Sequence, residues 1–398
     1  MISFELTEEQ SLVRETVRKF AAEELRPVAR TTERGGACPR ELRGRAAELG
    51  LGLLDVPEAQ GGAGLGLLGA ALVHEELAFG DAGLAIAILG PHAAPAALVE
   101  LGTPEQAARL LDRLAAPQAR GAIAWSESGP GLPLGGFRTT ARRDGDDWIL
   151  DGEKAFVVNG GVAECVVVFA QDAGTTGWSG ASAFVLDGRG EGATAGARCE
   201  WLGLEVVHAA PVRLAGVRVP GRDRLAGAGG FVVGAQRMFA RIAIANAARQ
   251  VGLARAAYES ALAYTQDRVA FGKVVAHFQA VSFTLAELAM EVDAARWMVW
   301  RAAASFDAGA EGALLHAAQA AVQANDAAWR VADHGVQLLG GAGFVQDHLA
   351  EKRMRDTKTL ALLGPSDQDH LVAASCALGL TEDAGAGLPI SALQPAVT

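Results

Sequence analysis

The chain has 398 residues, of which 50% are hydrophobic and 20% charged, and its formal net charge is −11. This composition excludes a disordered protein, and the acidic balance argues against a nucleic-acid partner held by a basic face. No apolar run approaches the ~18 residues that a bilayer requires, and the N-terminus lacks the pattern of a secretory signal, so no membrane association is expected. Four widely spaced cysteines indicate reduced thiols and a cytoplasmic protein, and no histidine or cysteine cluster predicts a metal site.

The first 120 residues predict helices. Thr7 and Gln10 form a capping-box pattern, and apolar residues then repeat at helical spacing up to Pro27. Four further helical stretches are predicted, namely 39–51, 67–79, 84–101 and 104–114. We expect residues 1–120 to form an N-terminal helical domain.

From residue 121 the pattern changes to short runs of β-branched residues separated by Asp-Gly turn signals, as at Asp144-Gly145 and Asp151-Gly152. This pattern predicts a central antiparallel β domain over residues 121–226. Long helical periodicity without proline returns after Gly229 and predicts a second helical domain over 227–380. Residues 381–398 are small and polar with two prolines, which favours a loose tail. The fold class is therefore α+β, with helices on both sides of a β domain.

Several short strings occur in a fixed order along the chain: WSESGPG at 125–131, GEKAFVVNGG at 152–161, DRVAFGK at 267–273, VQLLGGAGF at 336–344 and RMRD at 353–356. Together they resemble the acyl-CoA dehydrogenase family over nearly the whole chain. The resemblance implies a C-terminal four-helix bundle and an FAD cofactor that lies between the β domain and these helices. It also implies a homo-oligomer, a dimer or tetramer, in which a neighbouring subunit completes each FAD site.

The resemblance assigns FAD-binding roles to matched positions. Arg268 would bind the pyrophosphate, because a guanidinium suits two phosphate oxygens. Ser126 stands for the family's usual Thr and Phe156 for its usual Trp, whereas Val158 replaces a Thr that meets the flavin edge. The full set of implied cofactor-binding residues is Trp125, Ser126, Phe156, Val158, Arg268, Phe271, Gln279, Gln337, Gly340 and Gly341.

The catalytic base of the family is missing. The family removes an α-proton from an acyl thioester with a Glu, which aligns here with Leu363, and some relatives place the Glu at the position of Ile242. Neither side chain accepts a proton, so no catalytic residue is assigned. The backbone N–H of Leu363 is expected to remain available to polarise a carbonyl group.

A polar feature accompanies this loss. Ile242, Asn246 and Arg249 share one helix face, so Asn246 and Arg249 are expected to make the substrate pocket polar. The alternative is that Arg249 pairs with a core acid, Glu75 or Glu76. The predicted pocket comprises Phe239, Ile242, Asn246, Arg249, Leu363 and Gly364.

The favoured interpretation is an FAD-binding oxidoreductase of this superfamily that acts on an acyl thioester, or a related metabolite, by a non-standard mechanism. Ala240 and Ala243 replace residues that read the CoA nucleotide in relatives, so the thioester carrier is CoA or an acyl carrier protein. An electron-transfer flavoprotein is a possible partner, and oxygen activation is a possible chemistry. Two alternatives stay open: a non-catalytic partner subunit of a heteromeric dehydrogenase, and a flavin-free protein that uses the fold for non-redox chemistry.

Overall fold

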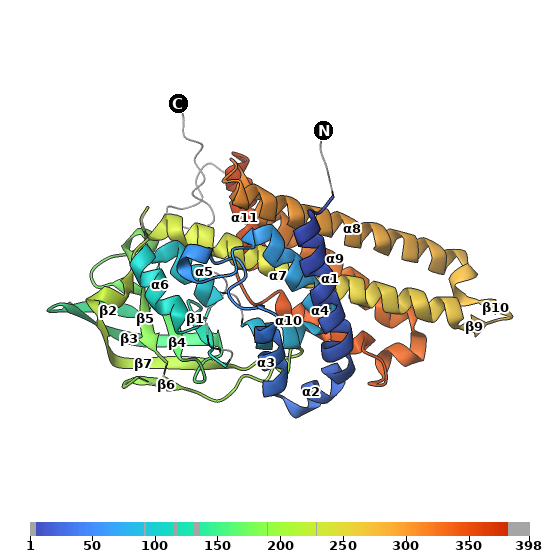
Figure 1. Ribbon diagram of the computed structural model, residues 1–398, viewed down its shortest axis with the longest axis horizontal. Helices are drawn as coiled ribbons and strands as arrows, with labels where there is room; N and C mark the ends of the chain where they lie inside the picture. The colour runs from blue at the N-terminus through green and yellow to red at the C-terminus, as the bar shows by residue number, and fades with distance from the viewer. Residues whose placement is uncertain are drawn as a thin grey trace.

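A computed structural model of the chain describes residues 5–380, apart from 91–92, 115, 117, 130–135, 189 and 228. The β domain lies at one end of an elongated molecule, and the long C-terminal helices run from it to the other end (Figure 1). The N-terminal helices pack where these two parts meet. The predicted order of helical, β and helical parts is therefore confirmed, whereas the predicted loose tail, 381–398, lies outside the described residues.

The N-terminal helices begin with α1 (Glu8–Phe20), which the Thr7–Gln10 capping box starts as predicted. The expectation that helical structure stops at Pro27 is wrong. A π-helical turn (Ala21–Leu25) and a 3₁₀ turn (Arg26–Val28) lead directly into α2 (Ala29–Gly35). Pro27 lies in the first turn of its 3₁₀ segment, where the missing N–H leaves no hydrogen bond unmade.

The longest N-terminal helix is α4 (Gly66–Leu89), and it is broken at Asp81, whose φ of −163° and ψ of 123° are extended. The Asp81 carboxylate accepts a hydrogen bond of 2.8 Å from the N–H of Leu84 and so caps the second half of the helix. The predicted break after residue 79 is thus present. The predicted helix 84–101 is two helices, because α4 ends at Leu89. The remaining N-terminal helices are α3 (Arg40–Glu48), α5 (Ala93–Leu101) and α6 (Pro104–Asp112).

The central domain is one sheet with the strand order β6-β7-β3-β2-β4-β5-β8. Most neighbours are antiparallel as predicted, but β2 and β1 each pair with β4 in parallel. Local sequence patterns do not distinguish these two pairings. The strands are β1 (Gly121–Ala124), β2 (Thr140–Asp144), β3 (Asp147–Val158), β4 (Cys165–Asp172), β5 (Ala181–Asp187), β6 (Ala193–Ala195), β7 (Ala209–Pro220) and β8 (Arg224–Leu225).

The C-terminal domain is built on α7 (Phe231–Asp267), whose middle is buried against α4 and α9. Alanine dominates this core, so the helix axes approach closely. A small hairpin, β9 (Val269–Ala270) and β10 (Lys273–Val274), follows α7 at the far end of the molecule (Figure 1). The other helices are α8 (Gln279–Asp307), α9 (Ala313–Leu338), α10 (Ala350–Leu360) and α11 (Asp367–Ala377).

Among the described residues, no single helix has both the length and the apolar character needed to cross a membrane. The bent pair α4 and α5, which meet at 55°, satisfies that test only when the two are taken together. Most side chains of both helices are buried in the protein core.

Candidate cofactor and substrate site

A cavity of about 360 Å³ lies where the β domain meets α7 and the turn between α10 and α11. Its walls are mostly apolar, and its volume is in the range of small-molecule pockets. Seven of the residues predicted for the cofactor and substrate sites line it: Trp125, Ser126, Phe156, Val158, Ile242, Leu363 and Gly364. Sequence patterns did not single out Trp201, Leu202, Lys358, Thr359 and Ser366, which also line it.

One wall of the cavity is fixed by a buried ion pair. Lys154 Nζ donates a 2.8 Å hydrogen bond to Glu127 Oε1, and the same oxygen accepts bonds from the N–H and hydroxyl of Thr139. Ser126, next to Glu127, accepts a 2.9 Å hydrogen bond at its carbonyl from the N–H of Ala155. Burial alone would raise the pKa of Glu127, but the charge and hydrogen bond of Lys154 lower it to about 2, so the carboxylate stays charged. Ser126 and Glu127 of the first string thus join the end of β1 to Ala155 and Lys154 of β3.

Phe156 is presented to the cavity by a β-bulge. The pairing of β3 with β7 shifts between Lys154 and Val157, and Phe156 within this irregularity has a φ of +49°. This left-handed conformation is strained for an aromatic residue. Phe156 is 66% exposed and lines the cavity. An exposed ring at this place is suited to cover a planar aromatic ligand.

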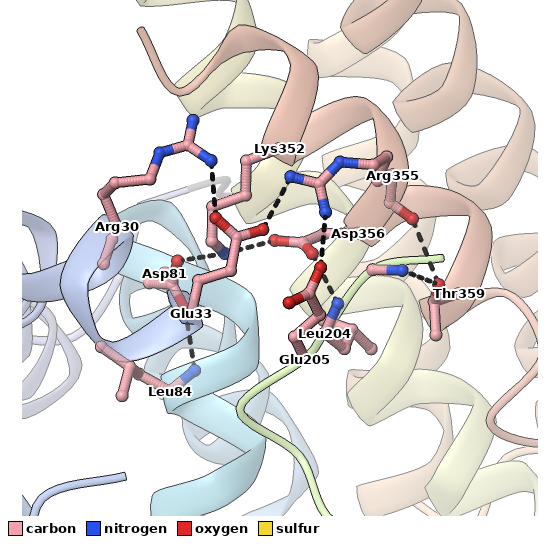
Figure 2. Close-up of polar contacts among 12 residues, drawn as sticks. Arg30, Glu33, Asp81, Leu84, Leu204, Glu205, Lys352, Arg355, Asp356 and Thr359 are labelled. Atoms are coloured by element: carbon pink, nitrogen blue, oxygen red, sulfur yellow. Dashed lines mark hydrogen bonds and ion pairs between the residues drawn. The ribbon is translucent and has the colours of Figure 1, made fainter. Parts of the chain in front are cut away.

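The opposite wall is held by α10. Asp356 accepts a 2.7 Å hydrogen bond from the N–H of Leu204, and Thr359 accepts one of 2.9 Å from the N–H of Gly203 (Figure 2). Gly203 lies so close to α10 that a Cβ atom there would be 2.5 Å from the backbone of Arg355. The RMRD string therefore docks the 201–204 segment, which carries Trp201 and Leu202 to the cavity.

Buried charges connect this wall to the N-terminal domain. Lys352 Nζ lies 2.6 Å from a carboxylate oxygen of both Asp81 and Asp356, and Arg355 pairs with Glu33 at 2.7 Å (Figure 2). Burial alone would lower the pKa of Lys352, but the charges of Asp356 and Asp81 raise it, so the ammonium stays charged. The break in α4, the 201–204 segment and α10 therefore form one cross-linked unit.

The described part of the cavity wall carries no carboxylate or imidazole group. Leu363 and Ile242 both line the cavity, and none of the described lining residues is an Asp, Glu or His. The nearest acids in sequence are engaged elsewhere: Asp367 accepts a 2.7 Å hydrogen bond from Asn325, and Asp369 caps α11 with Ser366. The expectation of an available N–H at Leu363 is wrong, because that N–H donates to the carbonyl of Leu360 at 3.0 Å.

Arg249 is fully buried beside this wall without an acidic partner among the described residues. Its Nη1 donates to Asn246 Oδ1 at 2.8 Å and its Nη2 to the carbonyl of Gly90 at 3.4 Å. Burial lowers the pKa of Arg249 to about 9. The alternative pairing with Glu75 or Glu76 is wrong, because Arg255 occupies both carboxylates.

Two other predicted pocket residues lie behind the wall. Phe239 is buried, and its ring packs edge-on against that of Trp125 with 5.6 Å between the ring centroids. Phe239 therefore supports the cavity from the core. Asn246 Nδ2 donates a 2.8 Å hydrogen bond to the carbonyl of Leu363. A Cβ atom at Gly364 would lie 3.5 Å from Asn246 Nδ2, so this amide is in close contact with the cavity-lining turn.

Family models match almost the whole chain: the acyl-CoA dehydrogenase N-terminal domain over residues 7–118, the middle domain over 122–217 and the C-terminal domain over 229–371. The chain belongs to the acyl-CoA dehydrogenase family. It is 34% identical to the short-chain specific acyl-CoA dehydrogenase of Bos taurus mitochondria, over 94% of this chain and 90% of the relative. It is 32% identical to the cyclohex-1-ene-1-carbonyl-CoA dehydrogenase of Geobacter metallireducens, over 91% of this chain and 96% of the relative.

The structure of butyryl-CoA dehydrogenase from Megasphaera elsdenii has the same fold, with a TM-score of 0.87 and 29% identity over 95% of this chain and all of that one. Acyl-CoA dehydrogenases bind FAD. The cavity suits the aromatic end of that cofactor, because Trp125 and the strained, exposed Phe156 offer ring surfaces beside the Ser126 hydroxyl.

The other positions predicted to bind FAD lie along the C-terminal helices and their connections, away from the cavity. Arg268 directly follows α7, 26 positions after Ile242, which places it about 39 Å further along the helix axis. Phe271 in the β9–β10 hairpin is 98% exposed, and the hairpin lies opposite the β domain (Figure 1). The first residue of α8 and the junction of α9 with the next 3₁₀ turn carry the rest of the set: Gln279, Gln337, Gly340 and Gly341. Within one chain, the two groups of residues predicted to bind FAD therefore lie far apart.

Proposed function

We propose that this chain is an FAD-dependent oxidoreductase that acts on an acyl thioester, carried by CoA or an acyl carrier protein, without a carboxylate base at either usual position. The single observation that carries the proposal is the composition of the cavity. It keeps the aromatic and hydroxyl groups that suit a flavin, while Leu363 and Ile242 contribute only hydrocarbon.

The apolar walls support an acyl ligand. Ile242, Leu202 and Leu363 surround the space with aliphatic carbon, and excluding water from such surfaces favours the binding of an acyl chain. Lys358 is an exposed cation at the same cavity, suited to a phosphate group. At the positions that read the CoA nucleotide in relatives, Ala240 and Ala243 are buried and offer no polar atom. A thioester of an acyl carrier protein therefore remains a candidate substrate, as does a CoA thioester.

FAD supplies the acceptor for an electron pair when it is bound. The residues of this chain would hold the ligands: Phe156 and Trp125 cover the ring, Ser126 offers a hydroxyl, and the docked 201–204 segment closes the cavity. Removing a proton from carbon needs an acceptor within hydrogen-bond reach, and no described lining residue provides one. Ordinary dehydrogenation of simple saturated acyl-CoA substrates is therefore not the reaction we propose. The electron acceptor, an electron-transfer flavoprotein or oxygen, stays a prediction.

A homo-oligomer is part of the proposal, because Arg268 of one copy would complete the cavity of another. The far end of the molecule supports such an interface through its exposed apolar side chains. These are Val269, Phe271, Phe283, Met290 and Phe344, between 58% and 98% exposed. Burying exposed apolar surface of this kind is what drives most protein association.

The test is to purify the chain alone and record its absorbance spectrum and oligomeric state, then add butyryl-CoA without oxygen. The proposal expects a yellow oligomer whose flavin absorbance butyryl-CoA does not bleach. Rapid bleaching would show that a proton acceptor does serve the cavity and would overturn the proposed loss of the base. A colourless monomer that takes up no added FAD would favour the non-redox alternative. A chain that becomes yellow only with a different polypeptide would favour the partner-subunit alternative.

A further inference from the structure

A second cavity lies between α3, the junction of α4 with α5, and the segment that leads into β1. Its volume is about 90 Å³. This is room for a ligand of several heavy atoms, since one water needs about 10–15 Å³. Gly52 and Ala116 in its lining are exposed, so the cavity opens to solvent. Arg43 and Arg120 are the charged residues of its described lining, and we call it the arginine pocket.

Arg43 brings a buried charge to this pocket without an acid to balance it. It is only 8% exposed, and its side chain donates to Cys38 alone among the described residues, with 3.2 Å from Nη2 to the carbonyl oxygen. Its buried Nε–H has no hydrogen-bond partner in the same part of the chain. The buried Lys352, by contrast, lies between Asp81 and Asp356. A buried guanidinium is costly until an anion compensates it.

Arg120 adds a second positive charge to the same pocket. Its backbone N–H donates to Glu164 Oε2 at 2.7 Å, but its side chain makes no hydrogen bond within the described ranges. Burial lowers the pKa of Arg120 and the charge of Arg43 lowers it further, whereas the charge of Glu164 raises it. Arg40 is a third cation that acts on this group. An anion that contacts both guanidinium groups of the pocket would relieve their mutual repulsion.

We propose that the arginine pocket binds a phosphate group, at a site separate from the cavity that suits the flavin. A guanidinium donates parallel hydrogen bonds to two oxygens, and a phosphate has enough oxygens for both Arg43 and Arg120. A phosphate monoester carries about −1.5 to −2 charges at pH 7, which balances two cations. The group belongs either to inorganic phosphate or to a monoester whose remainder lies at the open side of the pocket.

The backbone of the pocket is held in shape before any ligand binds. Leu53 and Asn159 line it with φ values of 49° and 62°, which are uncommon for residues other than glycine. Such conformations persist only where surrounding contacts impose them, and they are frequent at ligand sites. The Leu53 carbonyl accepts hydrogen bonds from the N–H groups of Val56 and Ala63, at 3.2 and 3.1 Å. A site that is already formed loses less entropy when its ligand binds.

The inference is independent of the proposed acyl-thioester function. No described residue lines both the arginine pocket and the cavity of about 360 Å³. The two spaces are nevertheless neighbours, because three elements each contribute one residue to either lining: Ala94 and Ala93 on α5, Asn159 and Val158 at the end of β3, and Gly121 and Ile123 on β1. A bound phosphate would therefore lie behind the wall of the substrate cavity rather than inside it.

The experiment is a calorimetric titration of the flavin-loaded protein with inorganic phosphate, in chloride buffers of constant ionic strength. Bound flavin keeps phosphate from the predicted FAD position at Arg268, and Arg268→Ala serves the same purpose if no flavin binds. Arg43→Leu and Arg120→Leu should each weaken phosphate binding about tenfold to a hundredfold, as for the loss of a charged hydrogen-bonded partner. Arg45→Leu removes an exposed arginine of the same helix, paired with Glu24 and Glu48, and should change nothing.

A second titration, with glycerol 3-phosphate, distinguishes the two sources of the group. Tighter binding than that of inorganic phosphate, lost in the same two variants, would identify a monoester ligand. Equal or weaker binding would identify the free ion. Wild-type protein that binds neither compound at millimolar concentration would overturn the inference, whether or not the variants fold. So would phosphate binding that survives both Arg43→Leu and Arg120→Leu. Neither of these results affects the proposed acyl-thioester function, which the bleaching experiment tests separately.

Discussion

Asn246 donates a hydrogen bond of 2.8 Å from its side chain to the backbone carbonyl of Leu363. This contact joins the middle of α7 to the turn that follows α10. The same turn is stabilised by the bonds from Ala361 to Thr357 and from Leu363 to Leu360. The backbone at position 363 is therefore held by groups that do not depend on the leucine side chain.

Replacing that side chain should restore proton abstraction. In Leu363→Glu the carboxylate would occupy the cavity wall at the place where relatives have their base. A general base typically contributes ~10²–10⁴ in rate, so anaerobic bleaching of the flavin by butyryl-CoA should accelerate by about that factor over wild type. Leu371→Glu, which adds the same charge at a half-exposed site on α11, is the control and should gain nothing. No gain in Leu363→Glu with flavin still bound would mean that the cavity no longer places an acyl α-carbon near residue 363.

Arg268 should contribute to FAD affinity although it lies far from the cavity of its own chain. Charge-assisted bonds to phosphate are worth ~1.5–3 kcal/mol, so Arg268→Ala should weaken FAD binding about tenfold to a hundredfold in a fluorescence titration. Lys273→Ala removes an exposed cation from the hairpin that follows Arg268 and serves as the matched control. Equal FAD affinities for wild type and Arg268→Ala would show that Arg268 does not bind FAD.

Two buried arginines of α7 should respond in opposite ways to the same substitution. Arg255→Met leaves Glu75 and Glu76 without their main buried partner, and breaking such a pair costs about 3–5 kcal/mol of unfolding free energy. Arg249→Met removes a buried cation that no described acid compensates, so the unfolding free energy should not fall. Urea denaturation of both variants measures the difference. A large loss in Arg249→Met would indicate a structural role for Arg249.

The sequence predicted the elements better than the contacts between them. Periodicity located the helices, and the short strings located the residues around the cavity. The partner of Arg249 was not predictable, because Arg249 and Arg255 are six positions apart and so lie about 120° apart around the helix at 100° per residue. Which of the two faces α4 depends on how the helices are rotated against each other. In the same way, the parallel pairs of β4 depend on contacts between distant strands rather than on local patterns.

Acid should destabilise the protein through Glu76. Burial alone would raise the pKa of this carboxyl, but hydrogen bonds and charge from Arg255, with hydrogen bonds from Arg18 and Arg14, lower it from 4.5 to about 2. Because the folded pKa is below the unfolded one, the stabilisation is complete above about pH 4.5 and is lost as the pH falls towards 2. It amounts to about 3 kcal/mol at 1.36 kcal/mol per pKa unit.

Urea midpoints of wild type and Glu76→Gln, measured between about pH 6 and pH 2.5, provide the check on this carboxylate. The two proteins should differ most at pH 6 and converge in acid. A constant difference across this range would show that Glu76 does not change its protonation state between pH 6 and pH 2.5.

The length of α7, which separates Arg268 from the cavity of its own chain, links the proposed cofactor site to self-association. If Arg268 of one copy completes the cavity of another, each FAD molecule bridges two chains, and the affinity measured for FAD depends on protein concentration. Dilution then releases the cofactor by separating the chains, and added FAD draws them together. A preparation that is pale at nanomolar concentration and yellow at micromolar concentration would then contain mostly separated chains without FAD in the first case and mostly associated chains with FAD in the second.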